Sequence, residues 1–242
     1  MKKYHRLLLL GDSITYGYGL AGGPESPFHY GNLLGEYLGI SKENTVNRAV
    51  NGDTSANLLA LLPSLEGEIK KADIIVISIG GNDLLGLIRE CVDSAENGRF
   101  KGTYRLSDIA ADPALIFGIA KENKPERLSS VMERYISNID GVMRWISTVN
   151  KDADVMLIMQ YDPFEGISVF EPLWKLSENN IGALNRSIAE ETKKYGYFFA
   201  DAYTPFLGHT SELTLMDIFD VHPNENGHRA IFEAVLKTLE NM

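Results

Sequence analysis

The run Asp-Ile-Ile-Val-Ile-Ser-Ile at residues 73–79 constrains the fold more than any other stretch of this chain. An almost unbroken β-branched run of this length is typical of a strand buried on both faces, as found in parallel sheets that helices cover on each side. A second short apolar run, at residues 6–10, leads into Gly11 and Ser13. Such runs alternate with longer amphipathic segments, and this alternation predicts βαβ units around a parallel sheet.

Five strands and five principal helices are expected from this alternation. The strands are predicted at residues 6–10, 45–50, 73–79, 155–159 and 197–200. The helices are predicted at residues 30–38, 57–71, 125–149, 177–195 and 224–239. Pro63 is expected to bend or break the second helix, because proline removes a helical hydrogen bond. We therefore expect one α/β domain over residues 1–242, with a flavodoxin-like, three-layer α/β/α architecture and a five-stranded parallel sheet.

The segment 84–124 does not follow this rhythm. It contains four glycines and one proline, with a modest helical pattern only near residues 106–120. A stretch of this length between a strand and its helix is usually functional or disordered. Because it directly follows residues 80–83, which we interpret as an active-site loop, we expect it to act as a lid that shapes substrate binding. A peripheral insertion without a role is the alternative.

Charge and cysteine content narrow the classes of partner. The chain of 242 residues carries a formal net charge of −10, which argues against nucleic acids and anionic membrane surfaces as partners. The single cysteine, Cys91, excludes an internal disulfide and is typical of a reducing compartment. The first apolar run is too short for a signal peptide, and no run has the length of a membrane span. We expect a soluble, cytoplasmic protein without membrane insertion.

Ser13 is a candidate nucleophile. It follows the first predicted strand, and α/β sheets bind their ligands in the crevice outside the carboxyl ends of the strands. A serine hydroxyl needs a base near neutral pH, and among the five histidines His222 is the best placed, on a loop just before the last helix. Asp220 stands two positions earlier and could orient the imidazole. The alternative for residues 220–223 is a polar loop that caps the helix.

Acyl transfer also requires hydrogen-bond donors directed at the developing oxyanion. Three candidates follow the first three predicted strands: the backbone N–H of Ser13, the backbone N–H of Gly52 and the side-chain amide of Asn82. Glycine at position 52 would permit a close backbone approach. Taken alone, the segments 51–54 and 80–83 are each typical of a turn. Their placement after consecutive strands favours a shared site.

In these residues the chain resembles the SGNH, or GDSL-type, hydrolases. The resemblance runs in order through Gly11-Asp12-Ser13-Ile14-Thr15, Gly52, Gly80-Gly81-Asn82-Asp83 and His222-Pro223, and so spans nearly the whole chain. It implies an esterase- or lipase-like fold with Ser13 as nucleophile, His222 as base, and an oxyanion hole formed by Ser13, Gly52 and Asn82. It also implies that no metal or organic cofactor is needed, and the scattered acidic residues have no recognisable metal-ligand spacing.

The chain departs from the family pattern at the acid. The family usually places this residue three positions before the histidine, where this sequence has Phe219. Asp220 is our first choice, because a small change in the path of the loop could bring its carboxylate to the imidazole. Asp217 is the second choice. A Ser-His dyad, oriented by a backbone carbonyl, is the third.

We expect a carboxylic ester hydrolase that acts on a small-molecule ester through an acyl-enzyme intermediate. A deacetylase, a lysophospholipase or a thioesterase could use the same residues, and a non-catalytic flavodoxin-like binding module is the alternative from another class. Three aromatic residues near predicted strand ends, Tyr16, Tyr18 and Phe164, could line an acyl pocket. The sequence specifies neither the natural substrate nor the oligomeric state.

Overall fold

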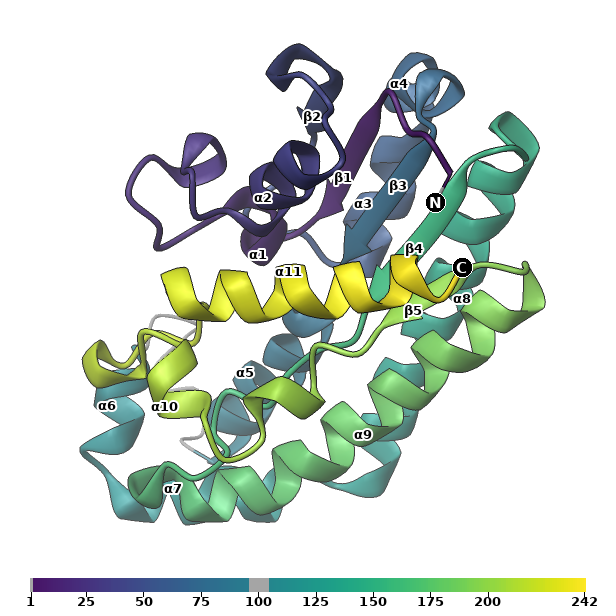
Figure 1. Cartoon of the computed structure of the whole chain (residues 1–242). Coiled ribbons are helices and arrows are strands. Elements are labelled where there is room, and N and C mark those ends of the chain that lie inside the picture. The colour runs from purple at the N-terminus through teal and green to yellow at the C-terminus, as the bar shows by residue number, and fades with distance from the viewer. Residues whose placement is uncertain (1, 96–104) are drawn as a thin grey trace.

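The computed structural model describes residues 2–95 and 105–242, and its centre is a five-stranded sheet. Every strand pairing is parallel, and the strand order is β2-β1-β3-β4-β5, which is the flavodoxin-like order (Figure 1). The strands are β1 (Leu7–Gly11), β2 (Thr45–Asn47), β3 (Ile74–Ser78), β4 (Asp154–Ile158) and β5 (Phe198–Ala200). The predicted fold class is therefore confirmed.

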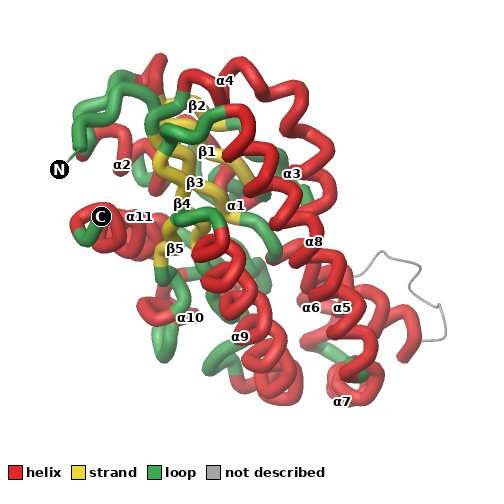
Figure 2. The backbone as a smooth tube through the Cα atoms, turned by 90° about the vertical axis from the view of Figure 1, so that its right-hand side faces the viewer, coloured by secondary structure: helices red, strands yellow, loops and turns green. Residues whose placement is uncertain are grey.

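Helices cover both faces of this sheet, which gives the three layers (Figure 2). On one face, Leu7 and Leu9 of β1 pack in a core with α2 (Tyr30–Tyr37) and α11 (Glu225–Glu240). On the other face, Leu8 and Leu10 belong to a larger core. Its helices are α3 (Ser55–Leu61), α4 (Glu66–Lys71), α5 (Gly81–Ala95), α7 (Pro113–Glu122), α8 (Pro125–Val149) and α9 (Glu171–Lys194). Burial on both faces explains why β1 and β3 are uninterrupted apolar runs.

The structure refines three predicted elements. The strand expected at 45–50 ends at Asn47, whose side-chain oxygen accepts a hydrogen bond from the backbone N–H of Ala49 and turns the chain. The helix expected at 57–71 is broken at Pro63, as predicted, and a 3-10 turn at Leu62–Leu65 separates its two parts, α3 and α4. The helix expected at 177–195 begins earlier, at Glu171, and carries a proline in its first turn, where proline is tolerated.

The segment after β3 also differs from its prediction. Residues 81–83 are the first turn of α5, not a loop, and this helix continues to Ala95. Its buried residues include Leu84, Leu87 and Cys91, at spacings of three and four, so tertiary packing stabilises a helix in spite of Gly86. The short α6 (Leu106–Ala110) precedes α7, and the part of the predicted lid between α5 and α6, residues 96–104, lies outside the described residues.

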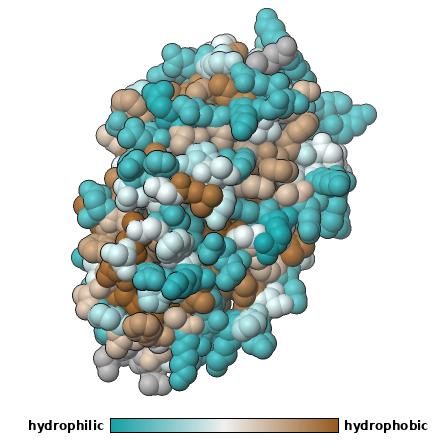
Figure 3. All heavy atoms as spheres, turned by 60° about the horizontal axis from the view of Figure 1, so that its bottom comes forward, coloured by the Kyte–Doolittle hydropathy of each residue, from teal (hydrophilic) through white to brown (hydrophobic). Residues whose placement is uncertain are grey.

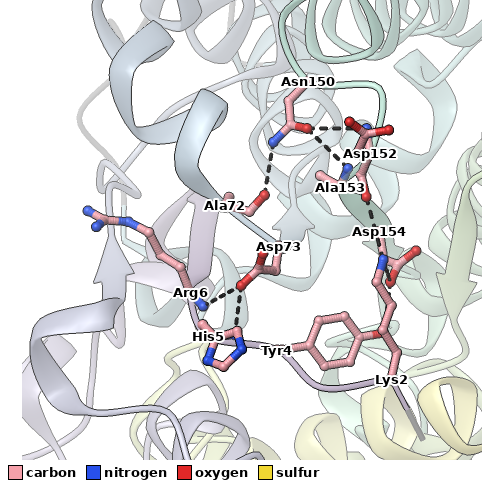
Figure 4. A network of polar contacts seen from close by, with 10 residues as sticks. All are labelled: Lys2, Tyr4, His5, Arg6, Ala72, Asp73, Asn150, Asp152, Ala153 and Asp154. Carbon is pink, nitrogen blue, oxygen red and sulfur yellow. Dashed lines mark hydrogen bonds and ion pairs between the residues drawn. The ribbon is translucent and has the colours of Figure 1, made fainter.

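Polar contacts hold together the edge of the sheet where the strands begin (Figure 4). The Asp73 carboxylate accepts hydrogen bonds from the backbone N–H groups of His5 at 2.7 Å and Arg6 at 2.9 Å. The Asp154 carboxylate accepts from the Tyr4 hydroxyl at 2.8 Å and pairs with the Lys2 ammonium at 2.9 Å. This network lies at the amino ends of the strands, so the carboxyl ends remain for the functional site.

Within residues 2–95 and 105–242, none of the helices is both long enough and apolar enough to cross a bilayer.

Candidate active site

Ser13 lies at the point where β1 leaves the sheet. Gly11 makes this exit possible, because its φ is +136° and a Cβ there would lie 2.0 Å from the carbonyl oxygen of Ser78 on the neighbouring strand. Only glycine fits such a position without displacing the β3 backbone. Ser13 then begins the short helix α1 (Ser13–Tyr16), which Asp12 caps by accepting a hydrogen bond from Ile14 N–H at 3.0 Å. The serine side chain is therefore held at the carboxyl edge of the sheet.

The loop before α11 carries the other two predicted catalytic residues. A 3-10 turn at Met216–Ile218 ends at Phe219, which has a left-handed φ of 57° and is the one non-glycine residue with positive φ in the described chain. The backbone N–H of Asp220 then bonds back to the Leu215 carbonyl at 3.1 Å, and Leu215 N–H bonds to the His222 carbonyl at 2.9 Å. These two bonds fold the loop back on itself.

Ser13, His222 and Asp220 form a chain of side-chain contacts. The Oγ of Ser13 lies 2.8 Å from Nε2 of His222. The other ring nitrogen, Nδ1, contacts Oδ1 of Asp220, which also accepts the backbone N–H of His222 at 3.0 Å. Asp217 is exposed on the 3-10 turn and makes no hydrogen bond to His222. Of the two candidate acids, only Asp220 therefore contacts the imidazole.

Two carboxyl groups at the site have shifted pKa values. Partial burial acts to raise the pKa of Asp220, but the hydrogen bonds from the ring and backbone of His222 outweigh it and lower that pKa below its ordinary value. Asp220 is thus an anion over the neutral pH range. Complete burial raises the pKa of Asp12 to about 7, although the bond from Ile14 N–H acts against this shift. The immediate neighbour of Ser13 therefore titrates near neutrality.

The three predicted oxyanion donors occupy separate elements. Within the described residues the backbone N–H groups of Ser13 and Gly52 make no hydrogen bond, as expected for the first N–H of a helix and for an exposed turn. Gly52 has a left-handed φ of 87°. Asn82, in the first turn of α5, donates one side-chain N–H to the carbonyl of Asp53 at 2.9 Å. This bond joins the turn that carries Gly52 to the start of α5.

A second contact aligns the same two elements. The Asp83 carboxylate accepts the backbone N–H of Ser55 at 2.9 Å and its hydroxyl at 2.6 Å. Ser55 is the first residue of α3 and Asp83 lies in the first turn of α5, so this pairing fixes the relative position of the two helix starts. Burial raises the pKa of Asp83, while the bonds from Ser55 act to lower it.

Gln160 is a residue of the site that sequence reasoning misses. It follows β4, is 3% exposed, and donates its side-chain N–H groups to Ser78 Oγ at 3.2 Å and to the Ile158 carbonyl at 3.1 Å. Its backbone forms a reciprocal pair with the side chain of Asn185 on α9. A polar residue directly after an apolar strand is the available signal, the same signal that identifies Ser13.

Tyr161, the next residue, supports the histidine loop. Its hydroxyl donates to the carbonyl of Val221 at 2.7 Å, and its ring stacks on Phe206 with centroids 4.1 Å apart. The ring of Tyr18 packs against the ring of His222, at 4.4 Å between centroids. These contacts hold the loop and its imidazole against α1 and the residues that follow it.

A cavity opens beside Ser13 and His222. Its empty space, including the part open to solvent, is about 880 Å³, and it is lined mainly by apolar side chains from α5 and α9 together with Phe164. Of the three aromatic residues predicted to line an acyl pocket, Phe164 does so, whereas Tyr16 and Tyr18 are exposed and do not line it. The remaining histidines do not line this cavity, and two of them, His29 and His228, are buried against each other.

Across the part of the chain that the structure describes, no group of three or more His, Cys, Asp or Glu residues is arranged to hold a metal ion.

Known proteins share this fold along nearly the whole chain. A lipase from a goat rumen metagenome superposes with a TM-score of 0.65 at 23% identity and covers 97% of each chain. Phospholipase A1 from Streptomyces albidoflavus NA297 superposes with a TM-score of 0.67 at 16% identity, over 97% of this chain and 99% of that one. At these identities the likeness establishes the fold.

The sequence itself has relatives as well. Spore germination lipase LipC of Bacillus licheniformis is 26% identical over 233 residues, which cover 93% of this chain and 91% of that protein. The model of the GDSL-like Lipase/Acylhydrolase family matches residues 9–230, a range that contains Ser13, Asn82, Asp220 and His222. The chain therefore belongs to the GDSL-like lipase/acylhydrolase family.

Proposed function

We propose that this protein hydrolyses carboxylic esters through a covalent acyl-enzyme at Ser13. Membership of a lipase/acylhydrolase family supports the reaction class. The observation that carries the choice of serine is the 2.8 Å separation between Ser13 Oγ and His222 Nε2. A serine hydroxyl becomes an effective nucleophile when a base within hydrogen-bonding reach can take its proton.

In the first half of the reaction, Ser13 Oγ attacks the carbonyl carbon while His222 Nε2 accepts the hydroxyl proton. Asp220, in contact with Nδ1, holds the tautomer in which Nε2 carries the free lone pair, and its negative charge stabilises the imidazolium. The imidazolium then protonates the leaving alkoxide, and the alcohol departs. In the second half, His222 removes a proton from water and the water oxygen attacks the acyl carbon. The bond from the acyl carbon to Ser13 Oγ then breaks, the imidazolium returns the proton to Oγ, and the acid is released.

The negative charge on the carbonyl oxygen needs donors during both halves. The N–H groups of Ser13 and Gly52 are without partners within the described residues, so they can donate to an oxyanion without first breaking a protein hydrogen bond. The Asn82 amide has two N–H groups, one of which is bonded to Asp53. We propose that the other N–H group of Asn82 is the third donor to the oxyanion.

The segment 84–124 has a proposed role in substrate binding. Its helices α5 and α7 contribute side chains to the cavity beside Ser13, which supports a segment that shapes the substrate rather than a peripheral insertion. A cytoplasmic location stays a prediction, which the single buried cysteine, Cys91, supports.

The hydrolysis of p-nitrophenyl butyrate by the wild type and by Ser13→Ala tests the proposal. We expect kcat/KM to fall by at least about 10³-fold in the variant, because the base and the oxyanion donors lack a nucleophile. Full activity in Ser13→Ala would contradict the assignment. An inactive wild type that also resists a fluorophosphonate would instead favour a non-catalytic binding module. Parallel assays with a thioester, an acetylated sugar and a lysophospholipid separate the alternatives that share this site.

A further inference from the structure

The cavity beside Ser13 extends away from the sheet, between α5 and α9. Both helices continue past the carboxyl edge of the sheet, and α7 packs against each of them at the far end (Figure 1). Side chains from all three helices line the cavity. The space therefore begins at the proposed nucleophile and ends at α7.

The walls of this cavity are mainly apolar, although Ser177 and Asn180 of α9 also line it. On α5 the lining residues include Leu84, Leu85 and Ile88, and on α9 they include Leu173, Leu176 and Ile181. Leu84 and Ile88 are four residues apart, and Leu173 and Leu176 are three apart, so each pair lies on one face of its helix. Two facing, mainly apolar stripes form a groove that suits an unbranched hydrocarbon chain better than a sugar, most of whose hydroxyls would remain unpaired there.

Helix geometry gives the length of the groove. Asn82, at the start of α5, and Cys91 both line the cavity, and nine residues of α-helix span about 14 Å, roughly the length of ten extended methylene carbons. We propose that the cavity binds the linear acyl chain of a medium-chain ester, about eight to twelve carbons long by this measure, and that α7 sets the upper limit. This inference rests on the proposed function, because it assumes that the acyl group is attached at Ser13.

Two residues, one in α7 and one at its carboxyl end, form that limit. Ile119 is 1% exposed and lines the cavity. Asn123 also lines it, and its side-chain oxygen is buried without a hydrogen-bond partner among the described residues. An apolar chain that reached Asn123 would meet this polar amide and offer its oxygen no hydrogen-bond partner, which disfavours longer chains. Ile119 thus limits the chain by volume, and Asn123 limits it by polarity.

The surface near α7 offers a residue for a control variant that leaves the groove unchanged. Hydrophobic residues lie there in patches among hydrophilic ones (Figure 3). Phe117 stands on the same helix as Ile119 but is 66% exposed and does not line the cavity. A change at Phe117 alters the surface of α7 without altering the groove.

The test is the kcat/KM profile on monomeric p-nitrophenyl esters from acetate to palmitate. For the wild type we expect kcat/KM to rise about twofold for each added methylene, below the roughly fourfold of complete transfer from water, and to fall beyond laurate. Ile119→Phe should lower the value for decanoate about tenfold and leave acetate within about twofold. Asn123→Leu should raise the value for palmitate about fivefold, because it removes the unpaired oxygen. Phe117→Ala should keep the wild-type profile.

The contrary outcomes are distinct. A wild type that prefers acetate, or unchanged profiles in both groove variants, would overturn the acyl-chain proposal while leaving ester hydrolysis in place. If Ile119→Phe misfolds and loses acetate hydrolysis, Ile119→Ala is measured in its place. The kcat/KM profile of Ile119→Ala should then extend to longer chains, and a profile that does not extend overturns the proposal. Failure of the proposed function looks different, because no ester of any length is then hydrolysed and Ser13 is not labelled by a fluorophosphonate.

Discussion

Phe219 determines which carboxylate reaches His222. A left-handed backbone costs a non-glycine residue about 1–2 kcal/mol, and the φ of 57° at Phe219 is stabilised by the bond from Asp220 N–H to the Leu215 carbonyl. The turn at Phe219 directs the next side chain, that of Asp220, toward the imidazole. This explains how an acid two positions before the histidine can contact it, where the family pattern has three.

The first prediction compares the two candidate acids. Asp220→Asn should lower kcat on p-nitrophenyl butyrate by about 10²–10⁴-fold, because the amide cannot stabilise the imidazolium and can favour the wrong tautomer. Asp217→Asn should stay within about twofold of the wild type, since its carboxylate is exposed and does not contact His222. Steady-state kinetics on both variants decide between them. Equal losses, or a larger loss at Asp217, would exclude Asp220 as the acid.

The second prediction concerns Asn82. Asn82→Ala should lower kcat about 10²–10³-fold with little change in KM, because an oxyanion donor acts on the transition state more than on the bound ester. Thermal melts of the same samples control for the lost bond to Asp53. If KM rises while kcat is unchanged, Asn82 contributes to ground-state binding instead.

At the scale of elements, the tight pairing of β1 and β3 leads to the third prediction. Gly11→Ala would place a Cβ 2.0 Å from the Ser78 carbonyl oxygen, so we expect a loss of about 3 kcal/mol or more in the free energy of unfolding. Gly67→Ala is the matched control. Gly67 lies in α4, and apart from its chain neighbours and its own helix backbone no heavy atom lies within 4 Å of the position that a Cβ would take there. Alanine at this position should stabilise the fold by up to about 1 kcal/mol.

Urea denaturation measures both changes. The same sign of change for Gly11→Ala and Gly67→Ala would contradict the interpretation that backbone crowding, and not glycine itself, matters at residue 11.

Elements differ in how far the sequence predicts them. β1 and β3 are buried on both faces, so their residues are apolar almost without interruption and the pattern is visible in the sequence. At the start of α5 the sequence predicts a loop, because glycines at 80, 81 and 86 favour turns. Burial of one helical face against α7 and α8 outweighs that local preference. The packing that decides this is not a property of the segment itself.

The residues of the candidate site also differ in how far the sequence predicts them. Ser13 and His222 are recognisable from a strand end, a loop before a helix and a family pattern. Gln160 is not, because its role depends on contacts with Ser78 and Asn185, which are 82 and 25 residues away in the chain. Local sequence patterns carry no information on such pairings.

At the scale of the whole molecule, buried titratable groups make opposing contributions to the pH dependence of the free energy of unfolding. Burial raises the pKa of Asp12 to about 7 and lowers the pKa of His29 to about 4. Between a pH of about 4 and a pH of about 7, Asp12 holds a proton in the folded protein and releases it in the unfolded chain. The contribution of Asp12 to stability therefore falls as pH rises. Folded His29 lacks a proton that the unfolded chain binds below pH about 6.5, so its contribution falls as pH drops. The two groups therefore oppose each other.

The fourth prediction separates these contributions. Asp12→Asn retains a capping side chain for α1 but removes the acid, so the stability of the variant should decrease more steeply on acidification than that of the wild type. The difference in the free energy of unfolding between pH values of about 7.5 and 4.5 should be larger in the variant by about 3 kcal/mol. Urea titrations at the two pH values measure it, with the exposed Asp217→Asn as control. Parallel pH dependence in Asp12→Asn and the wild type would show that Asp12 is not protonated in the fold.

The most direct measurement for the molecule as a whole is the site of reaction with a fluorophosphonate. The intact wild-type protein should gain one adduct, peptide mass spectrometry should map it to Ser13, and His222→Ala should suppress it, because the alkoxide forms only with the base in contact. The absence of an adduct, or an adduct on a residue other than Ser13, would contradict the proposal that this family member is a serine esterase with Ser13 as its nucleophile.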